Sequence, residues 1–151
     1  MFPNQQQQPN PQQQQQEQNI LQTAVCAHEF VRVYYSLLQS RVDELVKMYA
    51  QQAYLNWNGD LISGQQNIAE HLTSLTPGKY EIFTYDSQPV GGVNSNNVVM
   101  FIVTGNVKYN DNENLVRDFY HQFILQLTNI QINNQQTQKW VIISENFRLL
   151  R

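Results

Sequence analysis

The sequence predicts an α+β domain in which about three helices from its N-terminal half pack on a strongly curved antiparallel sheet. Apolar residues in the first part of the chain recur every three or four positions, as amphipathic helices require. After residue 78 the chain consists of four long segments with strand character, joined by polar loops. Helices first and strands afterwards are typical of the α+β class.

The first nineteen residues, MFPNQQQQPNPQQQQQEQN, contain almost nothing apolar after Phe2. Such a segment cannot bury enough surface to offset the entropy of ordering its backbone. We therefore expect a disordered, Gln-rich tail over residues 1–19 and one folded domain over residues 20–151. No segment has the basic start of a secretory signal or the ~20 apolar residues that span a bilayer, so no membrane association is expected.

Two helices are expected at the start of the domain. Between Ile20 and Gln39 an apolar stripe runs at helical spacing. Its members are Ala24, Ala27, Val31, Tyr34 and Leu38, and Phe30, Val33 and Leu37 widen it. A second, shorter helix is indicated by four apolar residues that would share one face, namely Val42, Leu45, Val46 and Tyr49.

The stretch YLNWNGDLISGQ, residues 54–65, predicts a β-hairpin. Its first arm alternates, with Leu55 and Trp57 on one side and Asn56 on the other. Asn58-Gly59 is the preferred pair for a two-residue turn, because both central residues need positive φ. The residues DLI then form the second arm.

A third helix should follow from Gly64 to about Ser74. Ser63 and Gln66 have the spacing of a capping box at its start, and Thr76-Pro77-Gly78 ends it. The four strands that come next are predicted over residues 79–90, 97–109, 115–129 and 138–150. Because their connections are short, they should form an antiparallel meander.

Two of the predicted strands carry apolar residues on both of their faces. An antiparallel sheet covered on one side normally alternates apolar and polar residues, yet residues 98–103 read VVMFIV and residues 140–144 read WVIIS. Ile124 is likewise expected on the outward side, opposite to Phe119 and Phe123. Because an open apolar face on a monomer would be a large exposed patch, a partner surface is the simplest explanation.

An enzyme is a less favoured alternative, based on the cavity that a curved sheet and its helices can enclose. The candidate groups are Tyr34, Tyr35, Trp57, Asp118 and His121. A carboxylate base and a tyrosine donor could abstract a proton beside a carbonyl. However, Asp118 and His121 are an odd number of strand positions apart and should point to opposite faces. Asp118 and Tyr120 are therefore expected on the outer face, away from any cavity.

Other chemistry finds little support in the sequence. Nine basic residues are scattered singly in a chain of net charge −3, whereas nucleic-acid binding requires a basic stripe. His28, His71 and His121 lack the spacing of metal ligands, so no metal, cofactor or catalytic residue is expected. The single Cys26 excludes an internal disulfide and suits a reducing compartment.

Five stretches together resemble the nuclear transport factor 2 family in order and spacing. They are EFVRVYYSLLQSRVDELVKMY at 29–49, WNGDLISGQ at 57–65, DSQPV at 86–90, RDFYHQFIL at 117–125 and WVIISENFRL at 140–149. The resemblance covers the chain from residue 20 to the end. It implies the cone of that family, in which the curved sheet wraps around the helices.

Within the family, two branches are to be separated: a homodimeric carrier of GDP-bound Ran, and the small subunit of the heterodimeric mRNA export receptor. The carrier has a glutamate after the hairpin tryptophan, where this chain has Asn58. Arg117-Asp118 is also similar to the export branch and absent from the carrier. The loop NDNEN retains the acidic residues Asp111 and Glu113. The export branch is favoured.

The resemblance then implies a non-enzymatic subunit that pairs through its sheet face with the large nuclear RNA export factor. Nuclear pore proteins with phenylalanine-glycine repeats would dock on the complex, which would shuttle between nucleus and cytoplasm. Binding of Ran and sequence-specific binding of nucleic acid are not expected. The alternatives are the homodimeric Ran carrier and, less favoured, the acid–base enzyme described above.

Seven residues are expected to bind the partner, namely Asp86, Gln88, Val99, Phe101, Asp118, Tyr120 and Ile124. Asp86 has two interpretations. By itself, an aspartate three residues before Pro89 indicates a strand end or turn where it caps a backbone amide. The resemblance implies instead a salt bridge with an arginine of the large subunit.

Overall fold

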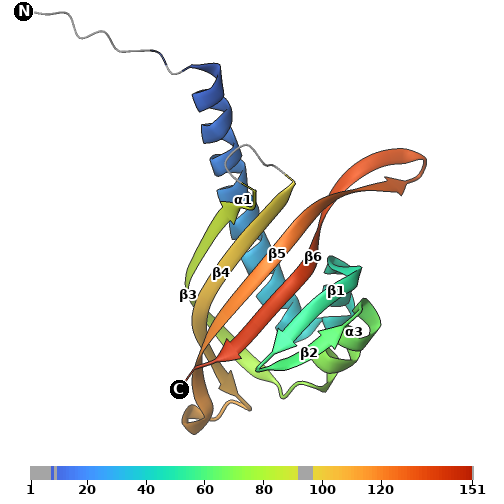
Figure 1. Cartoon of the computed structure of the whole chain (residues 1–151). Coiled ribbons are helices and arrows are strands. Elements are labelled where there is room, and N and C mark those ends of the chain that lie inside the picture. The colour runs from blue at the N-terminus through green and yellow to red at the C-terminus, as the bar shows by residue number, and fades with distance from the viewer. Residues whose placement is uncertain (1–7, 9, 92–96, 151) are drawn as a thin grey trace, which may run out of the picture.

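The computed structural model describes residues 8, 10–91 and 97–150 of the chain, and in them a six-stranded sheet lies against one long helix (Figure 1). In chain order the elements are α1 (Pro11–Ser40), α2 (Val42–Leu45), the 3-10 helix η1 (Val46–Met48), β1 (Tyr49–Trp57), β2 (Asp60–Ser63), α3 (Gln65–Ser74), β3 (Gly78–Pro89), β4 (Val98–Tyr109), the 3-10 helix η2 (Glu113–Leu115), β5 (Val116–Ile132) and β6 (Gln135–Leu149). The expected α+β class is confirmed.

The sheet has the strand order β2-β1-β6-β5-β4-β3 and is open, with β2 and β3 at its edges. Strands β3 to β6 form the predicted antiparallel meander. However, β1 runs parallel to β6, with Leu55 beside Glu145, so the sheet is mixed rather than wholly antiparallel. The expectation was wrong on this point because β1 joins the sheet beside the last strand, and no local pattern records that long-range pairing.

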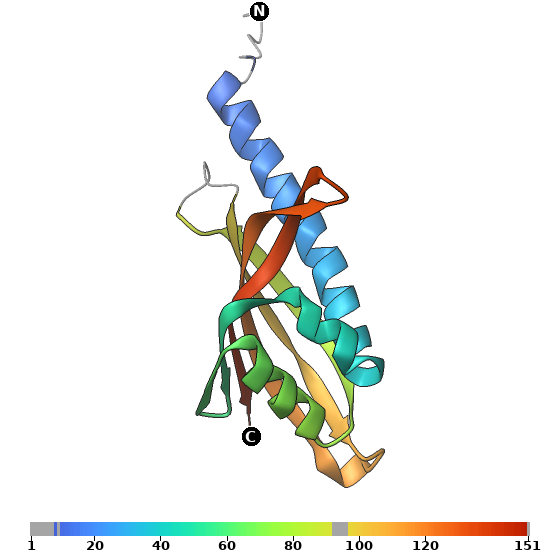
Figure 2. The same ribbon diagram turned by 90° about the vertical axis from the view of Figure 1, so that its right-hand side faces the viewer.

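Helix α1 begins at Pro11, earlier than the Ile20 expected from the apolar stripe. Residues 11–19 are therefore helical rather than part of a disordered tail, while residues 1–7 and 9 of that tail lie outside the described residues. The start is set by a capping box, in which the Asn10 side chain accepts the Gln13 N–H at 2.8 Å and the Gln13 side chain accepts the Asn10 N–H at 3.3 Å. Pro11 suits the first helical position. The first turns of α1 project past the sheet (Figure 2).

The predicted hairpin is confirmed, with Asn58 at φ 53° and Gly59 at φ 98°. Asn58 also joins the hairpin to the end of β6. Its N–H donates to the Phe147 carbonyl at 2.9 Å, and its Oδ1 accepts the Leu149 N–H at 2.8 Å. The asparagine in this turn therefore has a structural role of its own.

Two helix boundaries differ from the sequence expectation. Ser63 remains in β2, and Gly64, at φ 90°, caps α3 without a side-chain hydrogen bond, so the predicted Ser63–Gln66 capping box is absent. The neighbouring Gln65 instead ties α3 back to the preceding segment, because its amide donates to the carbonyls of Val46 and Tyr49 at 3.0 and 3.1 Å. Tyr49 opens β1 rather than ending the second helix.

Aromatic rings fill the space between α1 and the sheet. Phe30 of α1 lies 5.2 Å from Phe101 and 4.9 Å from Phe123 between ring centroids. On the other side of the core, Trp57 stacks on Phe147 at 3.9 Å. The interior of the cone is thus occupied by side chains packed as a core.

Val99 and Phe101 face this core, with exposures of 2% and 0%. They cannot offer the outward partner contacts expected of them. Side chains alternate along a strand, so the outward residues of this stretch are instead Met100 and Ile102, which are half-buried. The sequence could not choose between the two sets, because both faces of residues 98–103 are equally apolar.

Gly105 on β4 lies close against the backbone of the neighbouring strand β3. A Cβ at this position would lie 2.1 Å from the Glu81 carbonyl oxygen and 3.0 Å from Cζ of Phe119. We expect Gly105→Ala to lower the free energy of unfolding by about 1–3 kcal/mol through overpacking, as measured by urea denaturation. Asn106→Ala, on the next outward position of β4, should change it by less than about 0.5 kcal/mol. Equal stability of Gly105→Ala and the wild type would contradict this packing.

Candidate functional site: the open face of the sheet

The sheet face opposite the aromatic core carries a continuous set of side chains, which we term the open face. Strand register aligns these residues in rows, because directly paired residues share a face. One row contains Asp86, Ile102, Gln122, Asn146 and Asn56. The row on one side contains Gln88, Met100, Ile124, Ser144 and Tyr54, and the row on the other contains Thr84, Thr104, Tyr120 and Arg148.

Five of the seven expected partner-binding residues lie on this face. They are Asp86, Gln88, Asp118, Tyr120 and Ile124. Val99 and Phe101 do not lie on it, and the outward positions of that stretch belong to Met100 and Ile102, which the sequence did not single out. The outward position expected for Ile124 is confirmed, and its partner Met100 across β4 and β5 could have been found by extending the same alternation.

The open face has an apolar centre and a polar rim. Met100, Ile102 and Ile124 adjoin one another on β4 and β5 and remain half-buried. The flanking strands present charged groups, with Asp86 on β3 and Arg148 on β6. An apolar, uncharged centre surrounded by polar groups is the composition of protein–protein interfaces.

Asp86 lies within β3, opposite Ile102, and is exposed. Its position excludes the alternative of a strand end or turn. Among residues 8, 10–91 and 97–150, none forms a salt bridge with its carboxylate. The open face therefore presents an unneutralised negative charge beside its apolar centre.

The interior contains the other candidate groups. Tyr34, Tyr35, Trp57 and His121 are all buried, whereas Asp118 is exposed on the open face, as expected. The carboxylate inside is Glu145, which is 2% exposed and which sequence reasoning missed. It sits between polar residues in SEN, and only the pairing of β6 with its neighbours turns it inward.

Glu145 accepts hydrogen bonds from three buried donors. The hydroxyls of Tyr34 and Tyr49 donate to its two carboxylate oxygens, and His121 Nε2 lies 2.6 Å from Oε1. On the far side of the imidazole, the Tyr35 hydroxyl lies 2.8 Å from Nδ1. We term these five residues the Glu145 cluster.

Burial fixes the protonation of this cluster. It raises the pKa of the Tyr34, Tyr35 and Tyr49 hydroxyls well above the ordinary value, so they stay protonated and donate. Burial also lowers the pKa of His121, against the opposing effect of its hydrogen bond to Glu145. A neutral His121 donates from Nε2 to Glu145 and accepts at Nδ1 from Tyr35.

The Glu145 cluster is therefore satisfied internally and serves the fold. None of its five residues is more than 4% exposed, so a substrate could not reach them without rearrangement of the core. The geometry gives no support to the acid–base enzyme considered from the sequence.

The remaining histidines are dispersed. His28 Nδ1 lies 2.9 Å from the Tyr85 hydroxyl, and His71 packs on Trp57. Within the described part of the chain, no three His, Cys, Asp or Glu side chains are grouped so that they could hold a metal ion. Across the same residues, no helix is long and apolar enough to cross a membrane.

Comparison with known protein families identifies the family of this chain. Residues 26–149 match the model of the nuclear transport factor 2 (NTF2) domain, and the chain belongs to this family. The open, mixed sheet packed on helices is the fold of this family. It also confirms the resemblance inferred from the sequence.

Two relatives by sequence and one solved structure are similar to the chain over most of its length. The chain is 36% identical to NTF2-related export protein 1 of Bos taurus over 84% of its length and 88% of the relative's, and 30% identical to NTF2-related export protein 2 of Homo sapiens over 84% and 87%. Among solved structures, nuclear transport factor 2 of Cryptosporidium parvum superposes with a TM-score of 0.70 at 27% identity, covering 85% of this chain and 95% of that one. These names are those of export and transport proteins rather than enzymes.

Replacing one carboxyl oxygen of Glu145 by an amide nitrogen should destabilise the core. In Glu145→Gln the amide retains one acceptor for three buried donors, so we expect a loss of about 2–5 kcal/mol in the free energy of unfolding. The matched control is Glu81→Gln on exposed β3, which should change it by less than about 0.5 kcal/mol. Equal effects of the two substitutions in urea denaturation would show that the cluster does not stabilise the fold.

His121 should make stability depend on pH. Because its pKa is lowered in the folded state, the unfolded chain takes up a proton first as the pH falls below about 6.5. The stabilisation is complete above that pH and declines during acidification. We expect the free energy of unfolding to fall between pH 7 and pH 5, and to fall less in His121→Gln. His71→Gln is the comparison, since burial lowers the pKa of His71 as well. An unchanged pH profile in His121→Gln would contradict the assignment of a neutral, buried imidazole.

Proposed function

We propose that this chain is the small, non-enzymatic subunit of a heterodimeric nuclear export receptor for mRNA. Its open face pairs with the large nuclear RNA export factor. Phenylalanine-glycine nuclear pore proteins bind the resulting complex, which shuttles between nucleus and cytoplasm. The observation that carries the proposal is the apolar centre of the open face, formed by Met100, Ile102 and Ile124 and uncovered by any element of the described chain.

The relatives support the export branch over the Ran carrier. Export proteins of two mammals share 30–36% identity with the chain over most of both lengths. Asn58 stands where the carrier has a glutamate, and its side chain is engaged by the Leu149 N–H. The acidic loop retains Asp111, 3.9 Å from Lys79, and Glu113, 2.9 Å from Lys108, and does not itself separate the two branches.

Asp86→Arg tests the proposal at the rim of the open face. A charge pair at an interface is costly to break from one side, commonly about 2–5 kcal/mol, because the surviving charge remains desolvated and unpaired. We expect Asp86→Arg to abolish pairing with the large export factor in a pull-down and in calorimetric titration. The variant should stay folded, since Asp86 is exposed.

The control is Glu70→Arg, which makes the same charge change on exposed α3, away from the open face. It should leave pairing intact. Reversing the facing arginine of the partner to aspartate should restore binding to Asp86→Arg, at least in part. Unchanged binding of Asp86→Arg would place the interface elsewhere, whereas an unfolded variant would assign Asp86 to the fold.

A further inference from the structure

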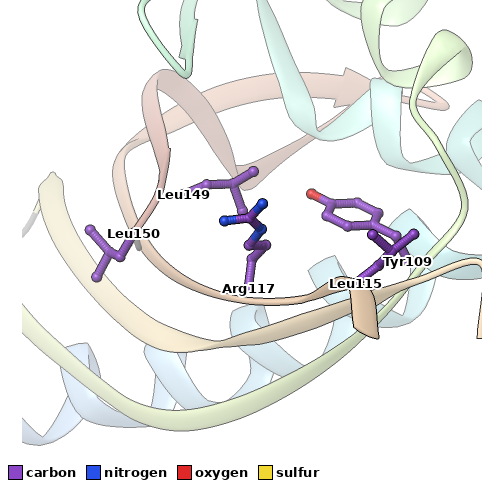
Figure 3. Close-up of a pocket in the computed structure, with 5 residues that line it drawn as sticks. All are labelled: Tyr109, Leu115, Arg117, Leu149 and Leu150. Atoms are coloured by element: carbon purple, nitrogen blue, oxygen red, sulfur yellow. The ribbon is translucent and has the colours of Figure 1, made fainter. Parts of the chain in front are cut away.

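A hollow lies at the end of the sheet where the C-terminal end of β6 meets the start of β5 (Figure 3). Its lining consists of Tyr109, Leu115, Arg117, Leu149 and Leu150. Two of the leucines are unusually exposed for their size, Leu115 at 41% and Leu150 at 47%. The NTF2 domain assignment does not explain this combination of exposed leucines and a cation.

Arg117 occupies a core-facing register position. It pairs with Val107, which is completely buried, and it lies two residues before the buried Phe119 on the same strand face. Arg117 itself is exposed, because the covered part of the sheet ends before it. Figure 3 shows its guanidinium between the side chains of Leu149 and Tyr109.

No residue within the described ranges forms a salt bridge with Arg117. The next residue, Asp118, points to the open face, and Glu113 in the adjacent loop pairs with Lys108. The positive charge of Arg117 also affects Tyr109 in the lining of the hollow. Burial raises the pKa of Tyr109, and the nearby guanidinium partly offsets this increase. The hollow thus offers the N–H donors of one guanidinium, flanked by apolar surface.

We propose that this hollow binds an extended segment of another protein in which an Asp or Glu stands beside a large apolar residue. The carboxylate would pair with the Arg117 guanidinium, in the planar geometry that favours two parallel hydrogen bonds. The apolar neighbour would cover Leu115 and Leu150. Arg117 and Asp86 lie on opposite faces of the sheet, so this site is separate from the open face and does not depend on the proposed pairing.

Selection from a random dodecapeptide library on the full chain tests this proposal. We expect enrichment of peptides with Asp or Glu next to Leu, Ile, Phe or Met. In fluorescence anisotropy, an enriched peptide should bind Arg117→Glu at least about tenfold more weakly than the wild type, because a charge-assisted pair is lost and repulsion replaces it. Replacing the peptide's acidic residue with lysine should restore binding to Arg117→Glu.

Arg32→Glu is the control, since Arg32 is an exposed cation on α1 and not part of the hollow. It should bind the enriched peptide as the wild type does. Circular dichroism should show that both variants are folded, as expected for exposed positions. The proposal is overturned if no acidic and apolar peptides are enriched, or if Arg117→Glu binds them with unchanged affinity.

Discussion

The structure depends on a strand that is apolar on both faces in a sheet that is covered on only one. The inward residues of β4, among them Phe101, pack against α1 and close the core. The outward residues Met100 and Ile102 are then left on the open face by the pleat of the strand. The helix-covered face and the apolar centre of the open face are therefore two consequences of the same six residues, VVMFIV.

The interior of the domain is filled by the Glu145 cluster and by aromatic side chains. The Glu145 cluster places a carboxylate, an imidazole and three hydroxyls together, which elsewhere could serve acid–base chemistry. Here every donor has an acceptor, and aromatic rings such as Phe30 and Phe123 occupy the remaining space. These polar groups contribute to the core, and both surfaces proposed for recognition, the open face and the hollow around Arg117, lie outside it.

The sequence predicted features with short-range causes and missed those set by distant pairing. The Asn58-Gly59 turn and the four long strands follow from local residues, and both are confirmed. The inward direction of Val99 could not be predicted, since it depends on which face α1 covers. Glu145 was missed for the same reason, because its partners are up to 111 residues away in the chain. The start of α1 at Asn10-Pro11 was a local signal that the glutamine-rich composition concealed.

The proposed pairing is tested most directly by the mass of the purified chain, measured by light scattering during gel filtration, alone and with the large nuclear RNA export factor. We expect a one-to-one complex with that partner, formed in preference to a pair of identical chains. The isolated chain should associate nonspecifically or be poorly soluble, because Met100, Ile102 and Ile124 remain uncovered. A stable homodimer that does not bind the export factor, or a soluble monomer that binds no partner, would contradict the proposed pairing.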